Sequence, residues 1–168
     1  RVEVVDAAAA DQPAVARLMQ LYTHDFSEFW AGLPRGEIGD DGLFPDYPDL
    51  DRFWSDPECG ALLIRVDGHL AGFALLNREA HSGRPADRNM AEFFVLRKHR
   101  GAGVGRQAAH VLFRRYPGQW ELAVARRNRP ALAFWTRAVE TWPTASGLEV
   151  IDLDQPDWNG PVLRFTST

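Results

Sequence analysis

The alternation of apolar and polar residues predicts the strands of this chain. Residues 1–7, RVEVVDA, alternate with period two, as expected for a strand with one buried face. Two apolar runs within residues 61–80 flank Asp67-Gly68, a dipeptide that favours a tight hairpin turn. Further apolar runs predict strands over residues 89–96, 119–125, 148–154 and 162–167, the last two around a turn at 155–161. The pattern therefore predicts about seven strands.

Apolar residues that recur every three or four positions predict three helices. The first covers residues 11–26, with Asp11 as its N-cap. The other two, residues 102–115 and 128–140, each follow a predicted strand, and Asn128 is the expected N-cap of the last. The order is one strand, a helix, a loop, three strands, a helix, a strand, a helix and two strands. This order predicts a mixed α/β sheet with helices on its faces.

Residues 31–60 follow neither period. They contain five glycines and four prolines among many acidic residues, yet they keep large apolar side chains such as Phe44, Phe53 and Trp54. The segment is therefore predicted to be a long ordered loop, with one short helix near residues 49–54. Loops of this length in compact domains are usually functional.

Composition limits the class of protein. A chain of 168 residues that is 45% hydrophobic is expected to form one domain, residues 1–168, with a sizeable core. Residues 1–30 show no signal-peptide pattern, and no apolar run approaches the roughly 18 residues of a membrane span. A cytoplasmic protein with no membrane partner is therefore expected. The single cysteine, Cys59, excludes an intrachain disulfide.

Charge is distributed unevenly along the chain. The net charge of −4 argues against a nucleic-acid partner. Residues 1–60 hold 13 acidic residues and four arginines, which gives −9, whereas residues 61–168 hold 10 acidic and 15 basic residues, which gives +5. Residues 97–137 alone hold ten basic residues and one acidic residue. We therefore expect the two ends of the domain to face ligands of opposite sign.

The most informative stretch is EFFVLRKHRGAGVGRQAAHVLF, residues 92–113, where a strand runs through a glycine-rich turn into a helix. Free N–H groups at a helix start, together with the helix dipole, favour an anionic ligand, and glycines let a phosphate approach the backbone. The spacing is not that of a Walker loop, because no Gly-Lys-Ser/Thr follows. It is not the dinucleotide fingerprint either, because position 106 is arginine.

The segment RGAGVG, residues 100–105, resembles the Arg/Gln-x-x-Gly-x-Gly/Ala motif of the GNAT superfamily of N-acetyltransferases. The preceding FFVLRKH and the downstream NRPALAFW also resemble segments of that family, in the same order. The resemblance covers nearly the whole chain and is weakest over residues 27–60. It implies a mixed, mostly antiparallel central sheet of about seven strands, with helices on both faces.

The resemblance also implies a ligand, acetyl-CoA as co-substrate, and no metal. N–H groups from Gly101 to Arg106 would hold its pyrophosphate, and the strand around Val95 would bond the pantetheine arm and offer an N–H to the thioester carbonyl. Which basic residue meets the 3′-phosphate stays open. The residues implied to contact the co-substrate are Val95, Leu96, Arg97, Arg100, Gly101, Ala102, Gly103, Val104, Gly105, Arg106, Asn128 and Trp135.

Attack on a thioester needs a neutral amine, so a base or a water chain must remove a proton. The best candidate is Glu92, on the same strand as Val95 and, by alternation, on its opposite face. The secondary candidates are Glu79, His81, His24, Asp25 and Glu28. Where many family members have a tyrosine that protonates the thiolate, this chain has Trp135, whose indole N–H is not a useful acid. Tyr22, Tyr47 and Tyr116 are the tyrosines available to replace it.

The sequence therefore predicts an acetyl-CoA-dependent N-acetyltransferase that acts on a primary amine by direct transfer in a ternary complex. The expected acceptor region is the 31–60 loop. Phe44, Tyr47 and Trp54 would wall the acceptor, and acidic residues would attract a cation: Asp25, Glu28, Asp40, Asp41, Asp46, Asp49 and Asp51. Amino acids, polyamines, aminoglycoside-like amines and peptides stay open, as does a homodimer. The rival class is a non-catalytic acyl-CoA-binding or sensing domain, which the tryptophan at position 135 favours.

Overall fold

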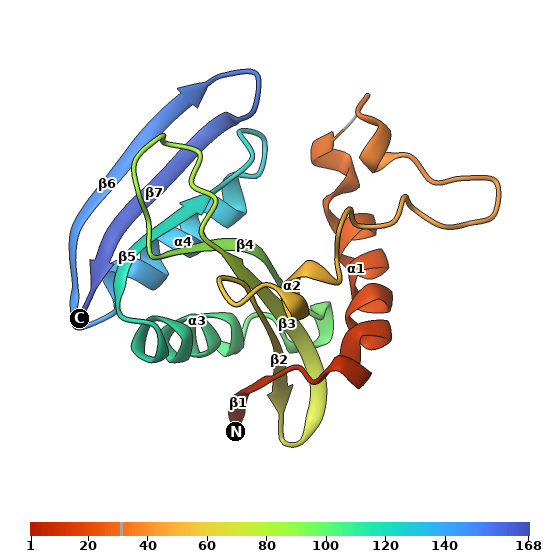
Figure 1. The fold of residues 1–168 in the computed structure, drawn as a ribbon, viewed down its shortest axis with the longest axis horizontal. Coiled ribbons are helices and arrows are strands. Elements are labelled where there is room, and N and C mark those ends of the chain that lie inside the picture. The colour runs from red at the N-terminus through yellow and green to blue at the C-terminus, as the bar shows by residue number, and fades with distance from the viewer. Residues whose placement is uncertain (31) are drawn as a thin grey trace.

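Seven strands form one sheet in the computed structural model, which describes residues 1–30 and 32–168. The sheet order is β1-β2-β3-β4-β5-β7-β6, and every neighbouring pair is antiparallel except β4 with β5 (Figure 1). The strands are β1 Val2–Asp6, β2 Gly60–Val66, β3 His69–Asn77, β4 Arg88–Val95, β5 Gly118–Ala123, β6 Ala145–Asp154 and β7 Asn159–Ser167. The predicted mostly antiparallel sheet of seven strands is confirmed.

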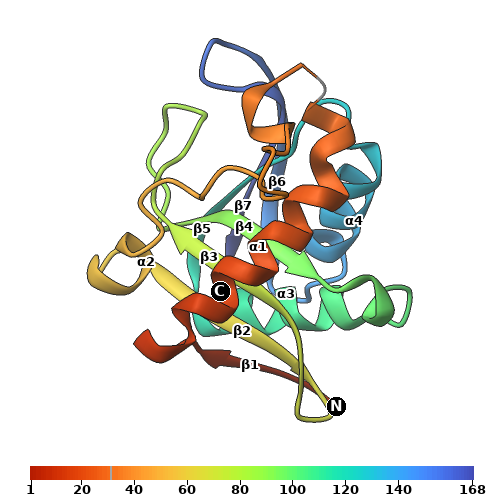
Figure 2. The same cartoon turned by 90° about the vertical axis from the view of Figure 1, so that its right-hand side faces the viewer.

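Helices cover both faces of this sheet, as predicted (Figure 2). The helices are α1 Gln12–Phe26, α2 Arg52–Ser55, α3 Val104–Arg115 and α4 Arg129–Glu140. Strand β2 shows how alternation divides the core: Leu63 belongs to the same buried cluster as Val15 of α1, on one face. Its neighbour Leu62 belongs to the cluster on the other face, which includes Leu112 of α3. Among the described residues, each helix is too short or too polar to cross a membrane.

The starts of two helices differ in detail from what the sequence pattern predicts. Helix α3 begins at Val104 rather than at residue 102, because Gly103 before it has a left-handed φ of 79°. Helix α1 begins at Gln12 with Asp11 at the N-cap position, as predicted, but the Asp11 side chain makes no capping hydrogen bond. The Asp11 carboxylate instead accepts the N–H of Ala8, at 2.7 Å, across a short 3₁₀ turn. The backbone conformation of Gly103 and a local hydrogen bond of Asp11 are therefore features of these two starts that apolar periodicity does not reveal.

The last two strands are longer than predicted. Strand β6 already begins at Ala145, before a register shift between Ser146 and Glu149 that includes Gly147 with a φ of 66°. The composition of residues 145–147 is typical of a turn, so the sequence does not predict that they pair with β7. The connection between β6 and β7 consequently shrinks to residues 155–158. The short helix predicted near residues 49–54 is present as α2.

Strand β4 leaves its parallel neighbour early, and this parting creates the space for a site. Only Arg88 and Asn89 of β4 pair with β5, although β4 continues to Val95. A bulge also interrupts its pairing with β3: Glu92 pairs with Leu75 and Met90 with Leu76, which leaves one extra residue between them. Bulges often re-aim side chains next to functional sites. The described β4–β5 ladder therefore leaves much of this edge of β4 unpaired.

Candidate functional site

Two cavities meet where β4 and β5 part. The smaller has a volume of about 360 Å³ and extends toward the β6–β7 turn. The larger has a volume of about 690 Å³ and extends over the glycine turn before α3. Six residues line both cavities: Phe26, Phe29, Phe93, Asn128, Ala131 and Trp135. The two cavities are therefore adjacent, and these six residues form their shared wall.

The glycine turn presents an uncapped helix start to the larger cavity. Gly103 is the N-cap residue of α3 and has no side chain to satisfy the first N–H groups. The first of these helix amides with a backbone acceptor is that of Gln107, which donates to Gly103 O at 3.0 Å. The N–H groups of the three preceding helix residues lack intrahelical partners, as at any helix start. The backbone here therefore offers a group of donors to an anion.

Gly105 has a different role, because it lets two helices approach. A Cβ atom at this position would lie 3.0 Å from Cε1 of Phe134 in α4. Helices α3 and α4 therefore pack closely beside the cavity, and Phe134 stacks on Phe93 of β4 with ring centroids 6.0 Å apart. The glycine motif thus combines an open helix start with a tight helix–helix contact.

Part of the positive charge at this turn is already paired. Asp25 of α1 accepts hydrogen bonds from both Arg97 and Arg100, each at 2.6 Å. Arg100 also donates its Nε hydrogen to the carbonyl oxygen of Val95, at 2.8 Å. Arg106 and Arg137 line the same cavity and make no ion pair with any described carboxylate. They supply the unpaired positive charge.

Most of the residues that the resemblance implies for the co-substrate come together around the larger cavity. Those that line it are Val95, Arg97, Arg100, Gly101, Gly103, Gly105, Arg106, Asn128 and Trp135. The other three do not. Val104 belongs to the core and is 6% exposed, Leu96 packs beside the α1 cluster, and Ala102 is exposed. The motif thus includes residues whose side chains do not line the cavity.

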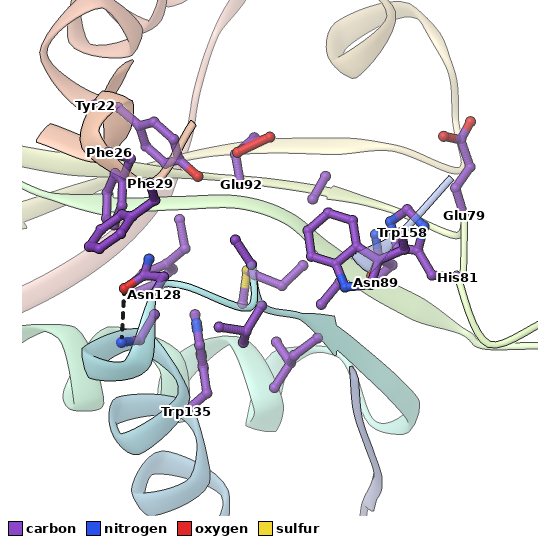
Figure 3. A pocket seen from close by; sticks show the side chains of 18 of the residues that line it. Tyr22, Phe26, Phe29, Glu79, His81, Asn89, Glu92, Asn128, Trp135 and Trp158 are labelled. Atoms are coloured by element: carbon purple, nitrogen blue, oxygen red, sulfur yellow. Dashed lines mark hydrogen bonds between the residues drawn. The ribbon is translucent and has the colours of Figure 1, made fainter. Parts of the chain in front are cut away.

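Glu92 lines the smaller cavity together with Tyr22 and Tyr47, and Figure 3 shows it beside Tyr22. Tyr47 donates to its Oε1 at 3.4 Å, and the hydroxyl of Tyr22 points toward it. Burial raises the pKa of Glu92, whereas hydrogen bonding from the Tyr22 hydroxyl and the positive charge of Arg35 lower it. Burial, followed by the charge of Glu92, raises the pKa of both tyrosines. The group is thus a carboxyl whose ionisation is shifted toward neutral pH, with two hydroxyls that stay protonated.

Trp135 and Asn128 form the shared wall from the side of α4. Trp135 is 8% exposed and contacts Phe93 edge-on, with ring centroids 4.9 Å apart. Its indole nitrogen is turned toward the cavity in Figure 3. Asn128 accepts the N–H of Ala131 at 3.2 Å, so its predicted role as the N-cap of α4 is confirmed. Both side chains also lie beside the space where the two cavities join.

The far end of the smaller cavity is held by a buried ion pair. Glu121, which is 0% exposed, accepts a hydrogen bond from Arg164 at 2.6 Å and another from the Ser82 hydroxyl at 2.6 Å. It also accepts the backbone N–H of His81, at 2.6 Å. His81 stacks on Trp158 of the β6–β7 turn, with ring centroids 4.8 Å apart. This network fixes the β3–β4 loop as one wall of the cavity.

The secondary acid and base candidates are spread over the molecule. Glu79 and His81 line the smaller cavity, although Glu79 is also paired with Arg52 at 2.5 Å. Asp25 and Glu28 line the larger one. His24 and Tyr116 line neither cavity. Of the tyrosines considered as proton donors, Tyr22 and Tyr47 lie in the smaller cavity.

The loop before β2 contributes to the smaller cavity, but with other residues than its composition suggests. Over residues 32–60, the side chains that line the cavity are those of Arg35 and Tyr47. The loop's described carboxylates, including Asp40, Asp41, Asp46, Asp49 and Asp51, do not line it. Trp54 instead donates its indole N–H to Ala7 O at 3.0 Å, which anchors α2 beside β1. Arg35, Phe26 and Phe29 were not predicted from sequence, and no motif marks them.

Comparisons with solved structures agree with this fold. An acetyltransferase from Thermus thermophilus has a TM-score of 0.66 and 16% identity, over 99% of this chain and 97% of that one. An acetyltransferase of the GNAT family from Staphylococcus aureus Mu50 has a TM-score of 0.65 and 13% identity, over 100% of both chains. PaiA N-acetyltransferase from Thermoplasma acidophilum, solved in complex with coenzyme A, has a TM-score of 0.57 and 16% identity, over 100% of this chain and 99% of that one.

Sequence comparison gives the family directly. No curated protein sequence shows significant similarity to the chain. The model of the acetyltransferase (GNAT) family, however, matches residues 15–139, which include most of α1, the glycine turn and nearly all of α4. Because this match covers well over half of the chain and the solved structures share its fold, the chain belongs to the acetyltransferase (GNAT) family of acyltransferases.

Proposed function

We propose that this chain transfers an acetyl group from acetyl-CoA to a primary amine by direct attack within a ternary complex. The observation that carries the proposal is the pair of cavities that share a wall where β4 and β5 part. One of them contains an uncapped helix start and unpaired arginines, which suit an anionic ligand. The other contains a carboxyl with a raised pKa, which suits an amine.

The residues of the larger cavity fit acetyl-CoA. The first N–H groups of α3 would bind the pyrophosphate, and Arg106 and Arg137 would balance its remaining charge. The unpaired edge of β4 offers backbone donors and acceptors to the amide groups of an extended pantetheine arm. The hydrogen bond from Arg100 to the Val95 carbonyl, together with that from Leu96 N to Ala71 O at 2.7 Å, fixes the peptide group that follows Val95. The N–H of Val95, in the preceding peptide group, is proposed to donate to the thioester oxygen.

Glu92 is the proposed base. The amine arrives mostly as an ammonium ion, because its pKa of about 10.4 is that of an ordinary lysine. Glu92 takes one proton, directly or through water, and the free amine attacks the thioester carbon. A C–N bond forms, the attacking nitrogen gives up its second proton to water or to the departing sulfur, and the C–S bond breaks with its electron pair on the sulfur of CoA. A thiol pKa of about 8.5 makes that departure feasible without a strong acid. Trp135 then serves as the wall of the junction.

An amine-panel screen that measures thiol release tests the proposal against its rival, a non-catalytic acyl-CoA-binding domain. The protein is mixed with acetyl-CoA and amino acids, polyamines, aminoglycosides or short peptides in turn. Sustained release of free CoA above the hydrolysis rate with at least one amine supports the transferase. Tight acetyl-CoA binding by calorimetry, without amine-dependent release across the panel, supports the binding domain, which the tryptophan at the junction would suit.

A further inference from the structure

One arginine lines the smaller cavity and has no carboxylate partner among the described residues. Arg35 lines the smaller cavity together with Glu92, Tyr22 and Tyr47. It is exposed, and it makes no ion pair with any carboxylate in residues 1–30 and 32–168. Arg97 and Arg100 at the neighbouring cavity, in contrast, both pair with Asp25. Arg35 therefore keeps its hydrogen-bond donors for a ligand.

The position of Arg35 is fixed by the local fold. Its guanidinium carbon lies 3.7 Å from the ring centroid of Trp30, so the planar group stacks on the indole. It belongs to a short 3₁₀ turn, Pro34–Gly36, in which Gly36 N donates to Leu33 O at 3.0 Å. A Cβ atom at Gly36 would lie 3.1 Å from Cβ of Trp30, so the turn packs closely on that residue. Such support limits the entropy that a ligand contact costs.

The end of the cavity near Glu92 thus carries one cationic and one anionic group within mostly aromatic walls. Glu79 and His81 lie at the other end (Figure 3). Glu92 lines the smaller cavity next to Phe93, which borders both cavities, and the amine must approach the thioester where the two cavities adjoin. Arg35 presents a planar fork that matches a carboxylate in two parallel hydrogen bonds. A polyamine or an aminoglycoside would bring further positive charge against this arginine. A molecule with an amine and a carboxylate satisfies both groups.

We propose that Arg35 binds a carboxylate of the acceptor, so that the acceptor is an amino acid with an apolar or aromatic side chain. This inference rests on the proposed function. The rings of Tyr22, Phe26, Phe29 and Trp30 supply the apolar surface for that side chain. A volume of about 360 Å³ is at the small end of ligand pockets, which suits a single residue better than a long chain.

A second reading must be separated from this one, because Arg35 also acts on Glu92. Its positive charge opposes the rise in the pKa of that carboxyl. If Arg35 served only as a counter-charge, its removal would affect every amine acceptor alike, through the pH profile. If it binds the acceptor carboxylate, its removal affects only acceptors that have one. Matched acceptors distinguish the two roles.

The experiment uses two pairs, phenylalanine with phenethylamine and leucine with 3-methylbutylamine. Each pair differs only in the carboxylate. The wild type is expected to prefer the amino acids. Arg35→Gln is expected to raise KM for them about tenfold to a hundredfold, as for loss of a charged hydrogen bond, and to leave KM for the simple amines unchanged. Arg17→Gln, which removes an exposed arginine of α1 outside both cavities, is the control and should change neither.

The outcomes separate this inference from the proposed function. Equal losses for both members of each pair, or a wild-type preference for the simple amines, would overturn the carboxylate role while the transferase activity stands. If none of the four compounds is acetylated, product binding tests the role of Arg35 instead. Calorimetry then compares N-acetylphenylalanine with N-acetylphenethylamine in the presence of CoA. Tighter binding of the carboxylate compound, lost in Arg35→Gln, supports the inference, and equal binding rejects it.

Discussion

At the scale of single residues, the chemistry of the site depends on what surrounds each titratable group. Glu92 is predictable from its place on the strand, and its role as the base stays a prediction. Nothing in the sequence indicates that Tyr22 and Tyr47 face it, because they come from α1 and from the loop before β2. Arg35 is one of eighteen arginines and belongs to no motif. Only the packing of distant segments distinguishes these residues from ordinary surface positions.

Replacing Glu92 tests the proposed base in two ways. Glu92→Gln should lower kcat/KM by roughly a hundredfold, because no group then takes the proton of the amine. In the wild type, the acidic limb of the pH profile should lie above the ordinary glutamate range of about 4.3, because burial raises this pKa. Initial rates of thiol release from pH 5 to pH 9 measure both effects. Unchanged turnover over that range would contradict the assignment.

Glu92→Gln, which should lower activity, should raise the stability of the fold at neutral and alkaline pH. A carboxyl whose pKa is raised by folding favours the folded state most when it is protonated, below about pH 4. That contribution is lost as the pH rises through the folded-state pKa. Glu92→Gln should therefore unfold at a higher temperature than the wild type at pH 8, and at a similar temperature at pH 4. Lower stability at pH 8 would show that the charged carboxylate is stabilised in place.

The tryptophan at the shared wall gives a second test at this scale. Trp135→Phe should keep most of the activity, and it should cost roughly 1 to 2 kcal/mol of stability because a packed ring is shortened. Trp135→Tyr introduces a hydroxyl that can donate a proton. We expect that amine attack or product release limits the rate, and kcat should then change little. A large gain in kcat below pH 8 would show instead that loss of the thiolate is the slow step.

At the scale of secondary structure elements, the order of strands and helices was predictable because each has a clear period or a clear start. The turn between β4 and α3 is recognisable from its glycines. The bulge in β4 and the early parting of β4 from β5 are not, because backbone hydrogen bonds between strands leave no mark in the sequence. Those two irregularities shape the cavities. The residues of the motif were thus predictable, but the space beside them was not.

The start of α3 provides the element-scale prediction. Gly103→Asp places a carboxylate where the pyrophosphate is proposed to lie, and it should weaken acetyl-CoA binding at least about tenfold by calorimetry. The matched control is Gly147→Asp. That glycine also has a left-handed φ, 66° against 79°, but it is exposed on β6, and a Cβ atom added there would have no neighbour within 4 Å. Equal affinities in the two folded variants would exclude the glycine turn as the anion site.

At the scale of the whole molecule, the β3–β4 loop is tied to the second half of the sheet by Glu121 of β5 and Arg164 of β7. The sequence shows the two charges but not their pairing, because 43 positions separate them. Composition predicts one domain with an uneven charge, and the acidic segment was expected to draw a cation to the acceptor site. In the structure the described carboxylates of residues 32–60 lie away from the cavity, and this segment contributes an arginine to it.

Breaking that buried pair should therefore affect the whole fold. Glu121→Gln leaves the Arg164 charge buried without its partner, which typically costs about 3 to 5 kcal/mol. Glu149→Gln removes an exposed partner of Arg84 and should cost less than about 1 kcal/mol. Urea unfolding compares the two variants. Adding Arg164→Met to Glu121→Gln should restore part of the loss. If the double variant instead loses the sum of what Glu121→Gln and Arg164→Met each lose alone, the two residues are not coupled.

The parting of β4 from β5 has a consequence for the lifetime of the protein. Under the proposed function, the co-substrate lies along the open edge and completes a sheet that the chain alone leaves unfinished. A ligand that binds only the folded state adds about 2.7 kcal/mol of stability at a concentration one hundred times its Kd. Protease attack follows the unfolded population, so abundance would rise and fall with the supply of acetyl-CoA. The same opening that admits the thioester would then match the amount of enzyme in a cell to the carbon available for it to use.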